Sequence, residues 1–366
     1  MAAKELMRDA LKDYSVYVAG NMQAKPVPGK PIAKLNLNEN QMGPGSKAME
    51  AMQKELPFGH LYAMDALIKL KKKISEHVNK PTECITTFGG SGGGIQCIAE
   101  TFLNPDDELL LCSPTYMAYY RLPSRYGAKL VEVQSPDGLS TDLDLLYDAI
   151  TDKTKLIFIC NPNNPTGTLL CPDKLKAFID KLPSHVICVV DEAYIDWVGK
   201  KDYPSAISWV EDGKNLIVLR TFSKIYGLAG CRIGYSVANP ELTQCLGSIS
   251  GSYNTNRIGA VGATAALDDV EYFTASYENN NTQRAYLMEE MRKMGMEVVE
   301  SNTSFIYFAP HCNTKDFLDH LASENVFIRG FTEEYVRVTI GLPEQNQQFL
   351  DAAAGFYAKN KLCKAM

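Results

Sequence analysis

Short, continuous apolar runs alternate with amphipathic stretches through the middle of the chain. The apolar runs predict β-strands at residues 83–88, 107–113, 129–134, 155–160, 185–191, 215–221 and 231–238. Helical periodicity lies between several of them, at residues 94–103, 142–150 and 172–182. Strands that are apolar on both faces and separated by helices are typical of a mostly parallel sheet covered on both sides. The pattern therefore predicts an α/β fold with a mostly parallel seven-stranded sheet flanked by helices.

The pattern changes near the end of this region. The runs at 215–221 and 231–238 are too close for a crossover helix, so we expect them to form an antiparallel pair. After residue 254 the sequence predicts a long helix at 280–295 and shorter strands at 296–301, 304–309, 326–331 and 335–341. These elements indicate a second, smaller α+β domain.

The N-terminal region precedes this alternation. Residues 1–20 have the pattern of an amphipathic helix, with Leu6, Ala10, Leu11 and Tyr14 on one stripe. Prolines and a glycine at 24–31 then interrupt regular structure. We predict an N-terminal segment at 1–44 that belongs to the small domain, a large ligand-binding domain at 45–254 and a small C-terminal domain at 255–366.

Composition narrows the classes of function. The 366 residues carry a formal net charge of −6 without a long basic block, which argues against a nucleic-acid partner. No run of about 18 apolar residues occurs, so no membrane span is expected. The N-terminus lacks a secretory signal pattern, although a removed presequence is left open. Several of the ten cysteines lie inside apolar runs, as expected in a reducing compartment such as the cytoplasm. Neither C-x-x-C nor H-E-x-x-H occurs, so no metal site is predicted.

Polar motifs follow five of the predicted strands. They read "GGSGGG", "SPTY", "NPNNPTG", "DEAY" and "TFSK" and begin at residues 89, 113, 161, 191 and 221. Because the carboxyl ends of parallel strands meet at one edge of a sheet, we expect these groups to lie together. "GGSGGG" opens a helix, where free backbone N–H groups can bind an anion. Asp191 ends a buried strand, so its carboxylate needs a partner.

One reading of "GGSGGG" is the G-x-S-x-G elbow of a serine hydrolase. Ser91 would be the nucleophile, and His311 or His320 would be the base. This hypothesis leaves Asp191 and Lys224 unexplained.

A single ligand would use all of these groups. It has a phosphate, a flat ring, a protonated ring nitrogen, a phenolic oxygen and an aldehyde that a lysine can attack. Pyridoxal 5′-phosphate has these five features. The "GGSGGG" amides, Ser223 and Arg232 match the phosphate, and Tyr116 matches the flat ring. Asp191 matches the ring nitrogen, Asn164 and Tyr194 match the phenolic oxygen, and Lys224 matches the aldehyde.

These motifs identify a family resemblance that covers nearly the whole chain from about residue 25. "PGKPIAKLNLNEN", "SPTY", "NPNNPTG", "DEAY", "TFSKIYGLAGCRIGY" and "VRVTIG" resemble fold-type I pyridoxal-phosphate aminotransferases of class I and II. Within that group the chain is most similar to histidinol-phosphate aminotransferases. The resemblance implies a homodimer with shared active sites, an amino donor and a 2-oxo acid acceptor.

The resemblance also implies a role for each matching residue. Lys224, Asp191 and Tyr194 are expected to be catalytic, and Lys224 holds the cofactor covalently. The expected cofactor contacts are Gly90, Ser91, Gly92, Tyr116, Asn164, Asp191, Tyr194, Ser223, Lys224 and Arg232, with Tyr62 reaching the neighbouring subunit's cofactor phosphate. The expected substrate contacts are Arg337 for the α-carboxylate, Arg329 for a second anionic group, and Asn40.

Three departures from the histidinol-phosphate pattern concern substrate recognition. Pro26 replaces a tyrosine, Gln41 replaces a proline, and Gly92–Gly93 replace an Asp-Glu pair. Backbone amides survive the glycine change, so cofactor binding is expected to survive. The resemblance implies transfer of an amino group between an amino acid or amino alcohol and a 2-oxo acid. Amino-acid oxidation, decarboxylation and elimination on the same fold remain as alternatives.

Overall fold

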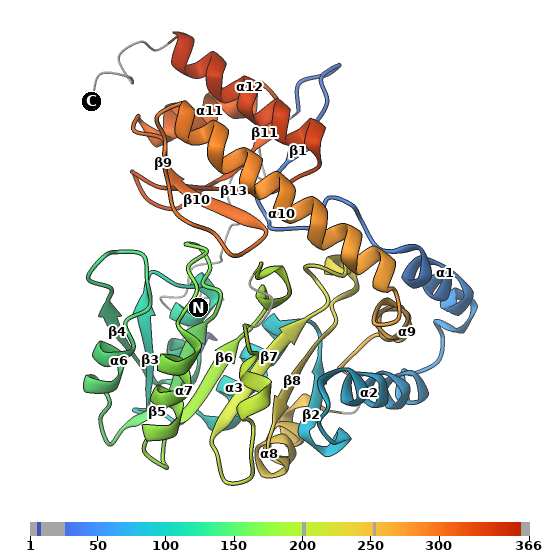
Figure 1. Cartoon of the computed structure of the whole chain (residues 1–366). Helices are drawn as coiled ribbons and strands as arrows, with labels where there is room; N and C mark the ends of the chain where they lie inside the picture. Colours follow the sequence, from blue (N-terminus) through green and yellow to red (C-terminus); the bar gives the residue numbers. More distant parts are fainter. Residues whose placement is uncertain (1–5, 9–25, 200–202, 252–253, 360–366) are drawn as a thin grey trace.

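The large sheet of the computed structural model has seven strands in the order β2-β8-β7-β6-β5-β3-β4 (Figure 1). The structure describes residues 6–8, 26–199, 203–251 and 254–359, so most of the helix predicted at 1–20 lies outside the described residues. The strands are β2 (Ile85–Phe88), β3 (Glu108–Ser113), β4 (Lys129–Gln134), β5 (Thr154–Cys160), β6 (Ile187–Asp191), β7 (Leu216–Thr221) and β8 (Gly234–Ala238). The predicted mostly parallel seven-stranded sheet is confirmed.

Strand β8 is antiparallel to both of its neighbours. The β7–β8 pair was expected from the short connection, and the turn is closed by Phe222 N donating to Ile233 O at 3.1 Å. The sequence did not predict that β8 also pairs with β2, far away along the chain. The pairs β3–β4, β3–β5, β5–β6 and β6–β7 are parallel.

Helices cover both faces of the large sheet, which explains the continuous apolar runs. Successive strand residues point to opposite faces, so Val189 packs in the cluster that includes α3, and Val190 packs in the cluster on the other face. Both side chains are fully buried. The helices of this part are α1 (Ser46–Glu55), α2 (Met64–Val78), α3 (Ser91–Phe102), α4 (Met117–Tyr120), α5 (Leu122–Tyr126), α6 (Leu143–Asp148), α7 (Pro172–Lys181), α8 (Pro240–Ser250) and α9 (Arg257–Ala266).

A smaller antiparallel sheet has the order β12-β13-β10-β9 and has its own apolar core. Its strands are β9 (Glu297–Val298), β10 (Phe305–Ala309), β12 (Arg329–Gly330) and β13 (Val336–Thr339), and its helices are α10 (Val270–Lys293), α11 (Thr314–Ser323) and α12 (Pro343–Lys359). Separately, β1 (Ala33–Lys34) pairs in parallel with β11 (Val326–Phe327), so part of the N-terminal segment lies with the C-terminal elements. The domain limits at 44 and 254 stay predictions.

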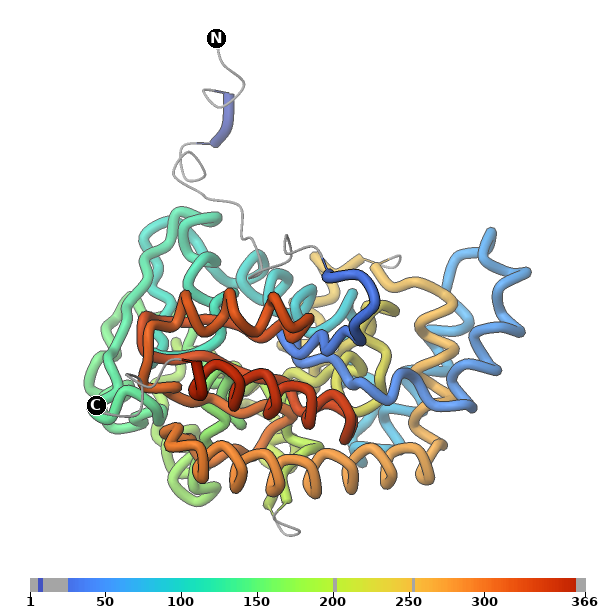
Figure 2. Tube along the Cα trace, turned by 90° about the horizontal axis from the view of Figure 1, so that it is seen from above, coloured from blue at the N-terminus to red at the C-terminus, as the bar shows by residue number. Residues whose placement is uncertain are grey.

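Two predicted elements differ from the structure. The strand predicted at 326–331 is divided into β11 and β12, which belong to different sheets. The helix predicted at 280–295 begins ten residues earlier, at Val270, where Asp269 caps it by accepting from Tyr272 N. Of the first ten residues of α10 only Ser276 is buried, so this part of the helix has no buried apolar stripe that the sequence pattern could show. Helix α10 runs along one side of the molecule from α9 to the small sheet (Figures 1 and 2).

Candidate active site

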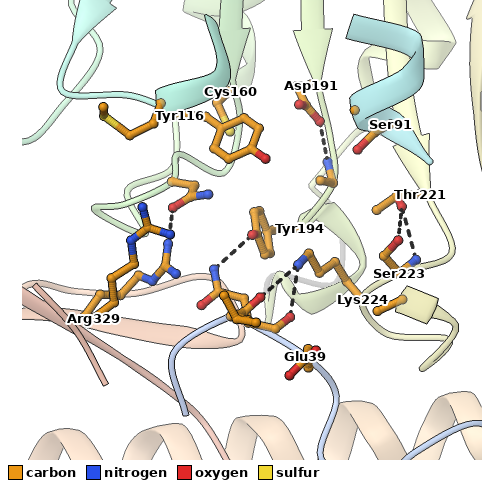
Figure 3. Close-up of a pocket in the computed structure, with 18 of the residues that line it drawn as sticks. Glu39, Ser91, Tyr116, Cys160, Asp191, Tyr194, Thr221, Ser223, Lys224 and Arg329 are labelled. Atoms are coloured by element: carbon orange, nitrogen blue, oxygen red, sulfur yellow. Dashed lines mark hydrogen bonds between the residues drawn. The ribbon is translucent and has the colours of Figure 1, made fainter. Parts of the chain in front are cut away.

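A cavity of about 400 Å³ lies at the carboxyl edge of the large sheet. Its walls come from three places: the ends of the parallel strands, the segment 37–39, and the β12–β13 hairpin of the small sheet (Figure 3). Most of the predicted site residues line it together, namely Ser91, Gly92, Tyr116, Asn164, Asp191, Tyr194, Ser223, Lys224, Arg232, Arg329 and Arg337. This arrangement agrees with the expectation that the strand ends bring these groups together at one edge of the large sheet.

Lys224 lies in the turn after β7 and points into the cavity (Figure 3). Its Nζ donates to the backbone oxygen of Asn38 at 3.1 Å and lies 5.4 Å from the centre of the Tyr194 ring. Removal from water is the main cause that lowers the pKa of Lys224 to about 8, and the nearby Arg337 guanidinium adds to it. The amine therefore has a neutral, nucleophilic fraction near neutral pH.

Asp191 ends β6 and is 2% exposed. Its Oδ2 accepts from Tyr119 OH at 2.8 Å, and its Oδ1 accepts from the Ala193 amide at 3.1 Å. Burial raises the pKa of Asp191 to about 6, and the Tyr119 hydrogen bond opposes that rise. Among the described residues no Lys, Arg or His lies within 4 Å of this carboxylate. Its charged form therefore calls for a cationic ligand group.

Helix α3 and Arg232 form the anion-binding part of the cavity. Among the described residues no side chain caps the N-terminus of α3 at Gly90, so the N–H groups of Ser91 and Gly92 are available to an anion, while Gly93 N donates to Gly90 O. Gly90 has φ +79, and a Cβ there would lie 2.2 Å from Arg232 Nη2. Glycine thus lets the guanidinium lie across the loop, where it donates to Gly89 O and to Ser223 Oγ at 3.3 Å each.

Three further predicted cofactor contacts surround the centre of the cavity. Tyr194 OH accepts from Asn38 Nδ2 at 2.9 Å, and burial raises the pKa of Tyr194. Asn164 Oδ1 accepts from Arg337 Nη1. Tyr116 presents its ring to the cavity at the start of α4 and makes an edge contact with Tyr119, with ring centres 5.4 Å apart.

Arg337 and Arg329 form the wall that faces these groups. They are opposite each other in the β12–β13 register. Arg337 is 3% exposed and donates to Asn36 O at 3.2 Å, while its Nε has no hydrogen-bond partner among the described residues. Burial lowers the pKa of Arg337 to about 10, which still leaves it cationic near pH 7. A buried guanidinium with an open donor is suited to hold a carboxylate or phosphate.

Three predicted site residues, Gly90, Tyr62 and Asn40, lie outside the cavity lining. Tyr62 is 74% exposed, between η3 (Leu56–Phe58) and α2. Asn40 donates through Nδ2 to Ile225 O at 2.9 Å and to Tyr272 OH at 3.0 Å, so it links the N-terminal segment to α10. The contact of Tyr62 with a neighbouring subunit and the substrate contact of Asn40 stay predictions.

The structure adds three residues that the sequence argument did not single out. Tyr119 contacts Asp191, Asn38 contacts both Tyr194 and Lys224, and Phe331 lines the cavity beside the two arginines. Tyr119 is three residues after Tyr116, a spacing that places both on one side of a helical turn and could have signalled it. Asn38 has φ 55, and no sequence pattern indicated that its carbonyl faces Lys224.

The residues present fit pyridoxal 5′-phosphate. An uncapped helix N-terminus with Arg232 suits a phosphate, a buried carboxylate without a cation suits a protonated ring nitrogen, and an amine of lowered pKa suits an aldehyde. The serine hydrolase alternative does not fit. No histidine is among the described residues that line the cavity, and His320 instead contacts Ala352 O in α12 at 3.1 Å.

The chain belongs to the class I and II aminotransferases, whose family model matches residues 30–352. Histidinol-phosphate aminotransferase 1 of Idiomarina loihiensis is 35% identical over 357 residues, or 96% of this chain and 97% of that one. The histidinol-phosphate aminotransferase of Moorella thermoacetica is 34% identical over 350 residues, or 90% of both chains. The aromatic amino acid aminotransferase of Mycolicibacterium smegmatis is 33% identical over 352 residues, or 96% of both chains.

Solved structures show the same fold. Histidinol-phosphate aminotransferase of Sinorhizobium meliloti, in complex with pyridoxal 5′-phosphate, has a TM-score of 0.87 at 24% identity and covers 96% of this chain and 98% of that chain. The protein is therefore a pyridoxal-phosphate-dependent aminotransferase, similar to the histidinol-phosphate aminotransferases. The predicted family, fold, activity and cofactor are confirmed, and the hydrolase alternative is wrong. No helix among the described residues is long and apolar enough to span a membrane.

Proposed function

We propose that the amino donor carries an anionic group, as histidinol phosphate does, and that a 2-oxo acid is the acceptor. The observation that supports this most strongly is the pair Arg337 and Arg329 on the wall across from Lys224. One guanidinium holds a carboxylate, and the second accommodates a distal carboxylate or phosphate.

The residues around the cavity then have distinct tasks. Pyridoxal phosphate supplies, when bound, a ring that stabilises negative charge at the substrate Cα. Lys224 holds the cofactor and moves a proton at Cα, for which an amine with a pKa of about 8 is suited. Asp191 keeps a proton on the ring nitrogen, and Tyr194 and Asn164 hold the ring oxygen. Ser223, Arg232 and the α3 amides hold the phosphate.

An aromatic amino acid is a second candidate donor. The similarity to the Mycolicibacterium smegmatis enzyme supports it, and the rings of Tyr116 and Phe331 offer apolar surface in the cavity. These two donors differ in the group that meets Arg329, which is a phosphate in one and a neutral ring in the other. Family membership favours amino transfer over the oxidase, decarboxylase and lyase alternatives.

We also infer that the protein is a homodimer whose subunits share their active sites. The exposed apolar side chains of the segment 49–68 support this: Met49, Leu56, Phe58, Leu61, Tyr62, Met64 and Ile68. An apolar surface of this kind marks a protein interface. A reducing, cytoplasmic setting is supported by the nine cysteines of the described residues, all of which are free. Cell fractionation measures that location.

A panel of donors tests the proposal. The purified holoenzyme is assayed with 2-oxoglutarate and with histidinol phosphate, unphosphorylated histidinol or phenylalanine as donor. We expect kcat/KM for histidinol phosphate to exceed that for histidinol by roughly 10- to 100-fold, because a hydrogen bond to a charged group contributes about 1.5–3 kcal/mol. Equal values for the two, or a clear preference for phenylalanine, would contradict the phosphate-bearing donor. Formation of glutamate confirms that transfer occurs.

A further inference from the structure

Phe331 packs against both arginines of the cavity wall. It follows β12, and a short turn brings the chain back to β13, with Phe331 N donating to Tyr335 O at 3.0 Å. The centre of the Phe331 ring is 5.0 Å from Arg329 Cζ and 5.0 Å from Arg337 Cζ. All three residues line the cavity. One aromatic ring is thus shared by two cations of the same site.

Two nearby guanidiniums repel each other, and the Arg329 charge is one of the causes that lower the pKa of Arg337. The face of an aromatic ring carries negative electrostatic potential and attracts a cation. Phe331 therefore offsets part of the repulsion and fixes the distance between the two charges. The hydrogen-bond partners of Arg337 among the described residues are Asn164 Oδ1 and Asn36 O, so a carboxylate does not perform this task there.

The Phe331 ring is itself held by its neighbours. It makes an edge contact with Tyr307, with ring centres 5.8 Å apart and planes at 81°. Tyr307 in turn stacks on Tyr335, with ring centres 4.8 Å apart and planes at 7°. Since Tyr307 is buried on β10, the ring of Phe331 is anchored to the small sheet rather than to the turn alone.

We infer that Phe331 is a positioning residue that holds Arg329 and Arg337 as a paired receptor for ligands with two anionic groups. This inference rests on the proposed function, because it concerns how the same cavity selects a dicarboxylate or a phosphate-bearing substrate over a singly charged one. Phe331 acts through the arginines and does not take part in the chemistry.

Binding of unreactive acids tests the inference without relying on turnover. Isothermal titration of the holoenzyme with glutarate, which has two carboxylates, and with butyrate, which has one, gives a ratio of dissociation constants. In Phe331→Leu we expect the glutarate affinity to fall about 10-fold and the butyrate affinity by no more than about 3-fold, as the loss of cation–π contacts predicts. Phe331→Tyr keeps the aromatic face and should keep the wild-type ratio.

Tyr335→Leu is the matched control, since among the described residues its ring stacks on Tyr307, whereas the guanidiniums lie over Phe331. It should leave the ratio unchanged, and thermal melting checks that each variant folds. An unchanged ratio in Phe331→Leu, or an equal change in Tyr335→Leu, overturns the inference. Failure of the proposed function looks different, because the wild-type enzyme would then use histidinol phosphate no better than histidinol, or would prefer phenylalanine, whatever its affinity for glutarate.

Discussion

At the residue scale, the opposed pKa shifts of Lys224 and Asp191 define the site. Burial makes a lysine less basic and an aspartate less acidic, so each group sits near the pH at which it can exchange a proton. The hydrogen bond from Tyr119 opposes this neutralisation of Asp191, because it stabilises the charged carboxylate. Tyr119 is fully buried and stacks on Phe158, so it is held in place.

Replacing Tyr119 by Phe should shift the pH dependence of cofactor binding. Without the hydroxyl, the charged form of Asp191 loses a donor and its pKa rises above about 6. The pH below which affinity for pyridoxal phosphate falls should therefore move upward, by about one to two pH units for a hydrogen bond worth about 1.5–3 kcal/mol. Cofactor dissociation constants measured across pH 5–9 would show this.

Tyr120→Phe is the control for that experiment. Tyr120 is the next residue and donates to Ser113 Oγ at 3.0 Å, without contact to Asp191. Its loss should leave the pH dependence as in the wild type. An identical pH profile for Tyr119→Phe and the wild type would show that the hydroxyl does not set the charge of Asp191.

At the scale of elements, the sequence predicted what depends on local pattern. The buried strands β3, β5, β6 and β7 were predicted because helices on both sheet faces require apolar residues at every position. The pairing of β8 with β2 was not predicted, because it joins segments separated by most of the large sheet. The site residues show the same difference between local sequence pattern and tertiary contact. Residues at strand ends were found from motifs, whereas Tyr119, Asn38 and Phe331 were missed because their roles depend on tertiary contacts.

The segment formed by α1, η3 and α2 should form the subunit interface. It lies at one end of the molecule in both views (Figures 1 and 2), and Ile68 in α2 is 68% exposed. Ile68→Glu would place a charge in an apolar interface, so we expect a larger fraction of monomer and lower activity at equal enzyme concentration. Sedimentation velocity of the holoenzyme measures the assembly.

Leu145→Glu provides the comparison, since Leu145 in α6 is 38% exposed at the opposite end of the large sheet (Figure 1). This substitution should leave the dimer intact. A wild-type holoenzyme that sediments as a monomer, or an Ile68→Glu variant that dimerises as well as the wild type, would contradict the proposed interface.

At the scale of the whole molecule, the cavity exists only where three parts of the chain meet. The large sheet supplies Lys224 and Asp191, the small sheet supplies Arg329 and Arg337, and the segment 37–39 lies between them. Asn38 connects these parts, because it contacts Tyr194 and Lys224 on one side and Thr339 of β13 on the other. On the proposed roles of these residues, cofactor binding and substrate recognition depend on different units, which must be held together.

The central claim is that Lys224 is the amine that holds the cofactor. The most direct test is borohydride reduction of the holoenzyme followed by peptide mass mapping, with Lys224→Ala as the control. We predict that the pyridoxyl mass appears on the peptide containing Lys224, and that Lys224→Ala folds normally but carries no label and transfers no amino group. A label on another lysine, or a label and activity that survive in Lys224→Ala, would contradict the account.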